Sequence, residues 1–316
     1  MTTRTVEEYA VSDPAGGPYA VATGPDGALW FTLVHSGRIG RLVPGHEPTH
    51  HQLDPDCGPT VLCTGPDAAL WFTQYRAHRI GRSTVTGEVT EFPLPTGQCG
   101  PFGIAVGPDD ALWFTETAAD RVGRITAEGS VTEYPLPRIG AFPSAIAAAQ
   151  DAMWFTMNQA NALGRIDMDG RITVHELPTG AAAPVGITVA RDGTVWFTEI
   201  AAGQIGRRTP DGRITEHPLP DRSARPHAIT TDPQGTAWFT EWGANRIGSL
   251  TRDGAITVHG LPTPASEPHG ITLGPDGALW TALETGALAR LDPAAAVAGA
   301  RSSAVPNVPN EKRNLS

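Results

Sequence analysis

The chain has 316 residues, of which 40% are hydrophobic and eight are tryptophan, so it can bury a sizeable core. Its net charge is −10 and no stretch gathers the basic residues, which argues against a nucleic-acid partner. No apolar run approaches the roughly 18 residues of a membrane span, and the start lacks the apolar segment of a signal peptide, so we expect a cytoplasmic protein without a membrane partner.

Glycine and proline are unusually frequent. The 36 glycines and 29 prolines make up about a fifth of the chain, against a usual share of roughly 12%. In a sequence rich in core-forming residues, they indicate many short elements separated by turns. Cys57, Cys63 and Cys99 form an odd set without the spacing of a metal site, and we expect reduced thiols.

The first predicted strand runs from Thr5 to Val11, and seven similar units follow it. Each unit predicts four strands, A to D: Pro-x-Gly-Ile, then Leu-Trp-Phe-Thr after a Gly-Pro-Asp-Gly turn, then Arg-Ile-Gly-Arg, then Ile-Thr-Glu-His-Pro-Leu-Pro after an Asp-Gly turn. The tryptophan of strand B recurs every 41 or 42 residues, at positions 30, 71, 113, 154, 196, 238 and 280. This period predicts β-propeller blades.

The seventh unit ends with strand C at Leu288 to Leu291 and has no strand D. The missing strand is present at the other end of the chain, as 5–11, and pairing it with the last blade would close the ring and remove two exposed sheet edges. The sequence therefore predicts an all-β fold: a seven-bladed β-propeller of four-stranded antiparallel blades, the last closed by the N-terminal strand. The propeller domain is expected to cover 1–292, and the aperiodic segment 293–316 to be a mobile tail.

The meander places the loops from D to A and from B to C on one face. The residue after the strand-A proline should look into the mouth of the central channel there, and its seven copies are Tyr19, Thr60, Phe102, Ser144, Val185, His227 and His269. Blades six, seven and one are neighbours once the ring closes, so His227, His269 and Tyr19 should lie together. Glu267 lies two residues before His269, and Glu284 follows Trp280 by four, which adds two carboxylates to the same sector.

Other polar or aromatic loop residues have a weaker claim to function. Glu116, Glu199 and Glu241 recur in repeat register directly after Trp-Phe-Thr, so we interpret them as structural. Tyr75 and Trp242, in loops from B to C, either pack the rim or form walls for an aromatic ligand.

Two carboxylates beside two imidazoles favour a divalent cation held by oxygen ligands, such as Mg²⁺. Such an ion next to a histidine combines a Lewis acid with a base. No Gly-x-Ser-x-Gly motif occurs and the cluster has no Ser or Cys, which disfavours covalent acyl transfer. Proton abstraction and metal-assisted hydrolysis both remain open.

The segments Gly-Pro-Tyr19, Arg-Pro-His227, Glu267-Pro-His269 and Leu-Glu284, on seven Trp repeats, resemble the virginiamycin B lyase (streptogramin B lyase) family over about 5–292. The resemblance implies a monomeric lyase that linearises type B streptogramins, cyclic depsipeptide antibiotics, and so confers resistance. Glu267 and Glu284 would hold Mg²⁺, His269 would accept a proton, and His227 and Tyr19 would contact the substrate. Blade seven departs from the repeat in having Trp280-Thr-Ala and a loop from B to C that is about one residue shorter.

The reaction that the resemblance implies is an elimination at the ester between a phenylglycine carboxyl and a threonine hydroxyl. His269 would take the threonine Cα proton while the cation acts as a Lewis acid, and the products would be a free carboxylate and a dehydrobutyrine residue. Two alternatives stay open, namely a metal-dependent lactone hydrolase on the same propeller and a propeller that binds a ligand without catalysis.

Overall fold

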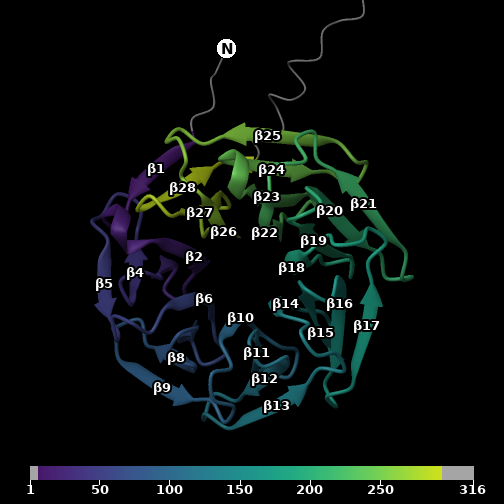
Figure 1. The fold of residues 1–316 in the computed structure, drawn as a ribbon. Coiled ribbons are helices and arrows are strands. Elements are labelled where there is room, and N and C mark those ends of the chain that lie inside the picture. The colour runs from purple at the N-terminus through teal and green to yellow at the C-terminus, as the bar shows by residue number, and fades with distance from the viewer. Residues whose placement is uncertain (1–5, 294–316) are drawn as a thin grey trace, which may run out of the picture.

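The computed structural model describes residues 6–293, which form a closed ring of seven four-stranded antiparallel sheets around a central channel (Figure 1). The predicted seven-bladed propeller is therefore confirmed. The predicted tail, 293–316, lies almost entirely outside the described residues. No described helix is long and apolar enough to cross a bilayer.

Each blade runs outward from the channel in chain order. Blades one to three comprise β2 (Pro18–Thr23), β3 (Leu29–Leu33), β4 (Arg38–Leu42) and β5 (Thr49–Gln52); β6 (Pro59–Thr64), β7 (Leu70–Gln74), β8 (Arg79–Ser83) and β9 (Val89–Pro93); β10 (Pro101–Val106), β11 (Leu112–Glu116), β12 (Arg121–Ile125) and β13 (Val131–Pro135). Blades four and five comprise β14 (Pro143–Ala148), β15 (Ala152–Met157), β16 (Ala162–Asp167) and β17 (Ile172–Glu176); β18 (Pro184–Val189), β19 (Val195–Glu199), β20 (Gln204–Arg208) and β21 (Ile214–Pro218).

Blade six comprises β22 (Pro226–Thr231), β23 (Ala237–Glu241), β24 (Arg246–Leu250) and β25 (Ile256–Gly260), and blade seven β26 (Pro268–Leu273), β27 (Leu279–Leu283) and β28 (Ala287–Leu291). Its fourth strand is β1 (Glu7–Ala10), which pairs with β28 from the other end of the chain (Figure 1). The predicted ring closure is thus present. Two short 3-10 helices, η1 (Pro14–Gly16) and η2 (Trp242–Ala244), lie in loops.

The repeated turn and tryptophan are joined by a buried polar contact. In blade one, Trp30 Nε1 donates to Asp26 Oδ1 at 3.0 Å, and Arg41 pairs with Asp26 Oδ2 at 2.6 Å. The same three-residue contact recurs in blades two, three and seven, as Asp67–Trp71–Arg82, Asp109–Trp113–Arg124 and Asp276–Trp280–Arg290. A buried indole N–H needs an acceptor, which explains why Asp, Trp and Arg recur at this spacing.

In blade seven, threonine replaces the phenylalanine of strand B, and alanine replaces the glycine opposite it in strand C. In blade one a Cβ on Gly40 would lie 2.1 Å from the ring of Phe31, so the phenylalanine of strand B needs a glycine opposite it in strand C. Blade seven pairs Thr281 with Ala289 at these two positions. The smaller residue in strand B leaves room for a methyl group in strand C, and both strands keep their register.

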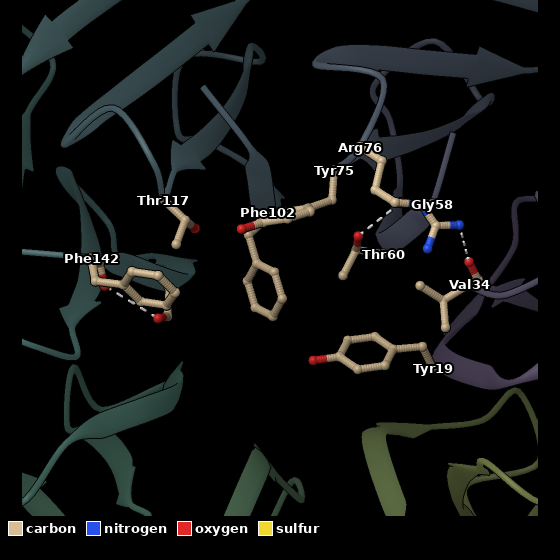
Figure 2. A pocket seen from close by; sticks show the side chains of 10 residues that line it. Tyr19, Val34, Gly58, Thr60, Tyr75, Arg76, Phe102, Thr117 and Phe142 are labelled. Carbon is tan, nitrogen blue, oxygen red and sulfur yellow. Dashed lines mark hydrogen bonds between the residues drawn. The ribbon is translucent and has the colours of Figure 1, made fainter. Parts of the chain in front are cut away.

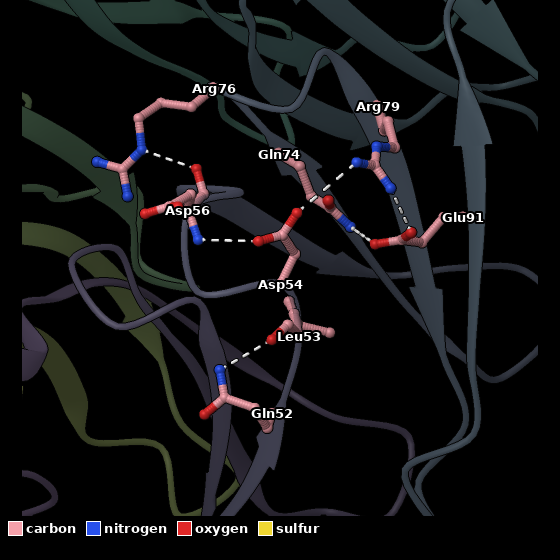
Figure 3. Close-up of polar contacts among 8 residues, drawn as sticks. All are labelled: Gln52, Leu53, Asp54, Asp56, Gln74, Arg76, Arg79 and Glu91. Atoms are coloured by element: carbon pink, nitrogen blue, oxygen red, sulfur yellow. Dashed lines mark hydrogen bonds and ion pairs between the residues drawn. The ribbon is translucent and has the colours of Figure 1, made fainter.

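The glutamates that we interpreted as structural are buried at the ends of strands β11, β19 and β23. Blade two has Gln74 at this position, and its amide donates to Glu91 at 2.8 Å while Arg79 pairs with the other oxygen of Glu91 at 2.6 Å (Figure 3). Glu116 takes this place in blade three, and neither of its oxygens has a hydrogen-bond partner among the described residues. Burial, and then the charge of Glu133, raise the pKa of Glu116 to about 8.

We expect Glu116→Gln to stabilise the protein in alkaline solution. The folded state keeps the Glu116 proton up to about pH 8, whereas the unfolded chain releases it near the ordinary pKa of 4.5. The free energy of unfolding therefore falls as pH rises between these values, and the variant lacks this loss. Its melting temperature should exceed that of the parent by roughly 5 °C at about pH 9 and match it near pH 5. Glu88→Gln, at an exposed position, is the control. If the melting temperature changes with pH in the same way for Glu116→Gln, the parent and this control, the expectation is wrong.

Candidate active site

Strand A of every blade contains a β-bulge directly after its first proline. The register against strand B shifts between Pro18 and Val21 in β2, and the same shift occurs at the corresponding residues of β22 and β26. Tyr19, His227 and His269 are the first residues of these bulges. A bulge bends the strand and re-aims its side chains, so the three residues face the channel mouth instead of following the pleat.

Buried threonines hold the backbone of the two histidines. The hydroxyl of Thr198 donates to the carbonyl of His227 at 2.8 Å, and that of Thr240 donates to the carbonyl of His269 at 2.9 Å. Each threonine comes from the preceding blade, and six blades make this contact to the next. Blade seven has Ala282 at this position, so the carbonyl of Tyr19 lacks the contact.

The carboxylate of Glu284 bonds to two imidazoles. Its Oε2 lies 2.9 Å from Nε2 of His269, and its Oε1 lies 2.8 Å from Nε2 of His35. The hydrogen bond from His269, aided by that from His35, lowers the pKa of Glu284 to about 2, so it is ionised at neutral pH. An ionised carboxylate only accepts, so both Nε2 atoms carry the proton. The Nδ1 of His269 has no partner among the described residues.

Tyr19, His227 and His269 form a compact aromatic group. The ring of Tyr19 lies 4.5 Å from that of His269 and 6.0 Å from that of His227, and the two imidazoles are 5.1 Å apart. Burial, with a smaller effect of His269, lowers the pKa of His227 to about 3, so this ring is neutral at physiological pH. Burial raises the pKa of Tyr19, which therefore keeps its hydroxyl proton.

Glu267 completes the cluster from the loop that enters β26. It is partly exposed and has a φ of +49°, in the left-handed region that residues other than glycine rarely adopt. Glu267, His269 and Glu284 each offer one ligand atom, and these atoms lie within 4.8 Å of one another. Two carboxylates and an imidazole in this arrangement can hold a divalent cation. The structure thus brings together all five residues that the sequence singled out.

His35 was missed by the sequence argument. It lies in the loop between β3 and β4 of blade one, where it bonds to Glu284 across the seam that closes the ring. The sequence singles out this loop in blade seven, and the repeat register gives no direct signal for a contact from the adjacent blade. The loop of blade seven has three residues between its strands, against four in blade one, as predicted. Because of this difference, Glu284 occupies in blade seven the place that His35 occupies in blade one. The amide of Glu284 donates to the carbonyl of Ser266, and the amide of His35 donates to the carbonyl of Gly16.

The two aromatic residues that we left open lie on opposite sides of this cluster. Tyr75 lines a cavity with Tyr19 and Phe102, as Figure 2 shows, and its ring lies 6.5 Å from that of Phe102. Trp242 lies beneath the guanidinium of Arg225, which is 5.3 Å from the ring centre.

Comparisons with known proteins identify the family of this chain. The model of the virginiamycin B lyase family matches residues 4–291. A virginiamycin B lyase of Saccharopolyspora erythraea is 70% identical over 53 residues, and one of Streptomyces coelicolor is 62% identical over 42 residues; these segments cover 16% and 13% of this chain, and 18% and 14% of the relatives. The matched segments thus span less than a fifth of these curated relatives.

Solved structures extend the similarity over the whole propeller. A virginiamycin B lyase from Staphylococcus aureus is 40% identical, with a TM-score of 0.88, over 92% of this chain and 99% of its own. A catalytically inactive histidine-to-alanine variant of that lyase, solved with quinupristin, is 38% identical with the same TM-score and the same coverage. With the family model matched over almost all of the described residues, the chain belongs to the virginiamycin B lyase family.

Proposed function

We propose that this protein linearises type B streptogramin antibiotics by elimination at their threonyl ester. The observation that carries the proposal is the carboxylate of Glu284, held by His269 and lying beside Glu267 at the mouth of the propeller. Membership of the lyase family and the similarity to a structure solved with quinupristin support the choice of substrate.

His269 is the proposed proton acceptor. Its Nε2 lies 2.9 Å from a carboxylate oxygen of Glu284, which fixes the ring at the channel mouth, while its Nδ1 is buried without a partner among the described residues. Transfer of the threonine Cα proton to the imidazole leaves an electron pair that forms the Cα–Cβ double bond and breaks the Cβ–O bond. The products are a free carboxylate and a dehydrobutyrine residue, and no water is consumed. A positioned base of this kind contributes roughly 10²–10⁴ in rate.

His227 and Tyr19 are proposed to bind and orient the substrate. The ring of His227 is neutral and the residue is partly exposed, and the protonated hydroxyl of Tyr19 is a hydrogen-bond donor. Both rings flank His269 and can hold the ester so that the Cα proton faces the base. His35 fixes the orientation of Glu284 from the opposite side.

Glu267 and Glu284 are the proposed ligands of Mg²⁺. Hard oxygen donors within a few ångströms of each other suit this cation, which keeps several waters and so leaves positions for substrate oxygens. When bound there, it supplies a Lewis acid for the oxygen atoms of the ester.

The mass of the product tests the proposed reaction. Quinupristin incubated with the protein and Mg²⁺ should give a linear product of unchanged mass, with a new carboxylate and a new carbon–carbon double bond. A product heavier by one water would indicate the lactone hydrolase instead. Binding without any product would favour a non-catalytic propeller.

We expect Glu267→Gln and Glu284→Gln to weaken Mg²⁺ binding, because each removes a charged oxygen ligand and keeps the volume of the side chain. In the parent protein, Mg²⁺ should raise the melting temperature by mass action, and both variants should need at least roughly tenfold more cation for the same rise. Excess Mg²⁺ should partly restore their turnover. Glu47→Gln, an exposed control in blade one, should behave like the parent. Turnover that is indifferent to a chelator would refute the metal assignment.

A further inference from the structure

A ring of left-handed residues surrounds the channel mouth. In every blade the residue before the strand-A proline has a positive φ: Gly17 (62°), Gly58 (61°), Gly100 (61°), Phe142 (54°), Ala183 (52°), Arg225 (51°) and Glu267 (49°). Blades one to three use glycine, which adopts this conformation without strain. Blades four to seven use residues with a Cβ, which are strained in this conformation.

Phe142 adopts this strained conformation and is also exposed. The residue retains 37% of its accessible surface, although phenylalanine is normally buried. Asp120 holds the loop, since its Oδ1 accepts the amide protons of Ala141 at 2.8 Å and of Phe142 at 3.1 Å. The amide of Asn158 donates to the carbonyl of Phe142 at 3.1 Å. The fold therefore fixes an aromatic ring at the surface in a conformation that glycine would adopt more easily.

The ring of Phe142 lines a cavity of about 360 Å³, together with Tyr19, Phe102 and Tyr75 (Figure 2). This volume lies within the range of small-ligand sites. Four blades contribute these four rings. The rings of Tyr19 and Phe102 meet edge to face at 6.1 Å, an arrangement that leaves ring edges and faces for a further aromatic group.

The serine and threonine hydroxyls and the arginine on the wall of the cavity are bonded to backbone carbonyls. Thr60 donates to the carbonyl of Gly58 at 3.0 Å, Thr117 to that of Pro143 at 2.7 Å, and Ser144 to that of Phe142 at 3.3 Å. Arg76 donates to the carbonyls of Asp56 (Figure 3) and Val34 (Figure 2). The cavity therefore offers an occupant mainly apolar contacts.

Tyr19 is shared by this cavity and the catalytic cluster. It lines the cavity and its ring lies 4.5 Å from that of His269. We propose that the cavity, with Phe142 as its outer wall, binds an aromatic side chain of the cyclic depsipeptide whose ester lies at His269. This assignment rests on the proposed function and adds to it a specificity site in blades one to four, opposite the metal ligands of blade seven.

Phe142→Gly provides a sharp test, because it removes the ring and relieves the backbone strain together. Binding of quinupristin is measured by calorimetry in the His269→Ala background, where the antibiotic stays intact. Because the variant loses the apolar contact of the phenyl ring, the dissociation constant should be about ten- to a hundredfold larger with Phe142→Gly than without it. The melting temperature should stay the same or rise. Ala183→Gly, at the same position of blade five, relieves the same strain but should leave the dissociation constant unchanged.

The outcomes separate this assignment from the proposed function. Suppose that the unmodified protein cleaves quinupristin. If the double variant His269→Ala/Phe142→Gly then binds quinupristin as tightly as the single variant His269→Ala, the cavity assignment is wrong and the proposed function stands. If quinupristin is neither bound nor cleaved by the parent, the proposed function is wrong and the assignment falls with it. Phe142→Leu adds a graded measure, since an apolar group without a ring should restore only part of the affinity.

Discussion

Replacing His269 with alanine is expected to abolish turnover of quinupristin while binding remains measurable. The imidazole is held by the carboxylate of Glu284, and it lies beside both proposed metal ligands. Without it, proton removal from the threonine Cα loses its base, a loss of roughly 10²–10⁴ in rate. Initial rates and calorimetric binding, measured on the same preparation, check both parts of this expectation.

His227→Ala is the informative comparison, because both histidines occupy the same bulge position one blade apart. His227 lies 5.1 Å from His269 but is not among the proposed metal ligands, so its loss should reduce affinity and rate without stopping turnover. A substrate deuterated at the threonine Cα should show a primary isotope effect with the parent protein. His46→Ala, an exposed histidine of blade one, should have no effect. If His269→Ala kept most of its rate, the base would be another residue, with His227 the next candidate.

Deletion of residues 1–12 is expected to lower the melting temperature by roughly 10 °C or more and to stop turnover. The deletion removes β1 together with the buried side chains of Val6 and Val11, and it uncovers Trp280, whose ring lies 5.0 Å from that of Tyr9. Loss of the buried contacts of Val6, Val11 and Tyr9 lowers the free energy of unfolding by about 5 kcal/mol. The edge of β28 also loses its ladder of hydrogen bonds.

The loss of turnover has a separate cause. The amides of Val11 and Ser12 donate to the carbonyl of Gly286 at 2.9 and 3.1 Å, which anchors the loop that carries Glu284. Two other deletions are matched controls and should leave activity intact. One removes 2–5 and keeps β1, and the other removes 296–316, which lies beyond the repeat. A 1–12 deletion that melts like the parent would mean that the N-terminal strand does not stabilise blade seven.

The repeat carried most of the information on the fold. A tryptophan every 41 or 42 residues, turn motifs at constant offsets and the displaced strand D are local features, so blade number and ring closure follow from them without knowledge of packing. The same register placed Tyr19, His227 and His269 at equivalent positions after the strand-A proline, and the structure shows that each begins a bulge. The register also separated Glu116 from Glu284, since only the former recurs with the repeat, but it did not reveal that Glu116 is a buried acid whose pKa is raised to about 8.

By itself, the sequence determined the seven-bladed ring, its closing strand and the face on which the candidate residues meet, because strand alternation and turn chemistry act over a few residues. Only the tertiary structure decided which side chains touch across the closing seam. His35 and Glu284 are 249 residues apart, and their contact depends on how blade one packs against blade seven. The left-handed conformation of Phe142 likewise depends on Asp120, a residue of the preceding blade. Contacts of this kind come from packing between blades, which no period in one strand encodes.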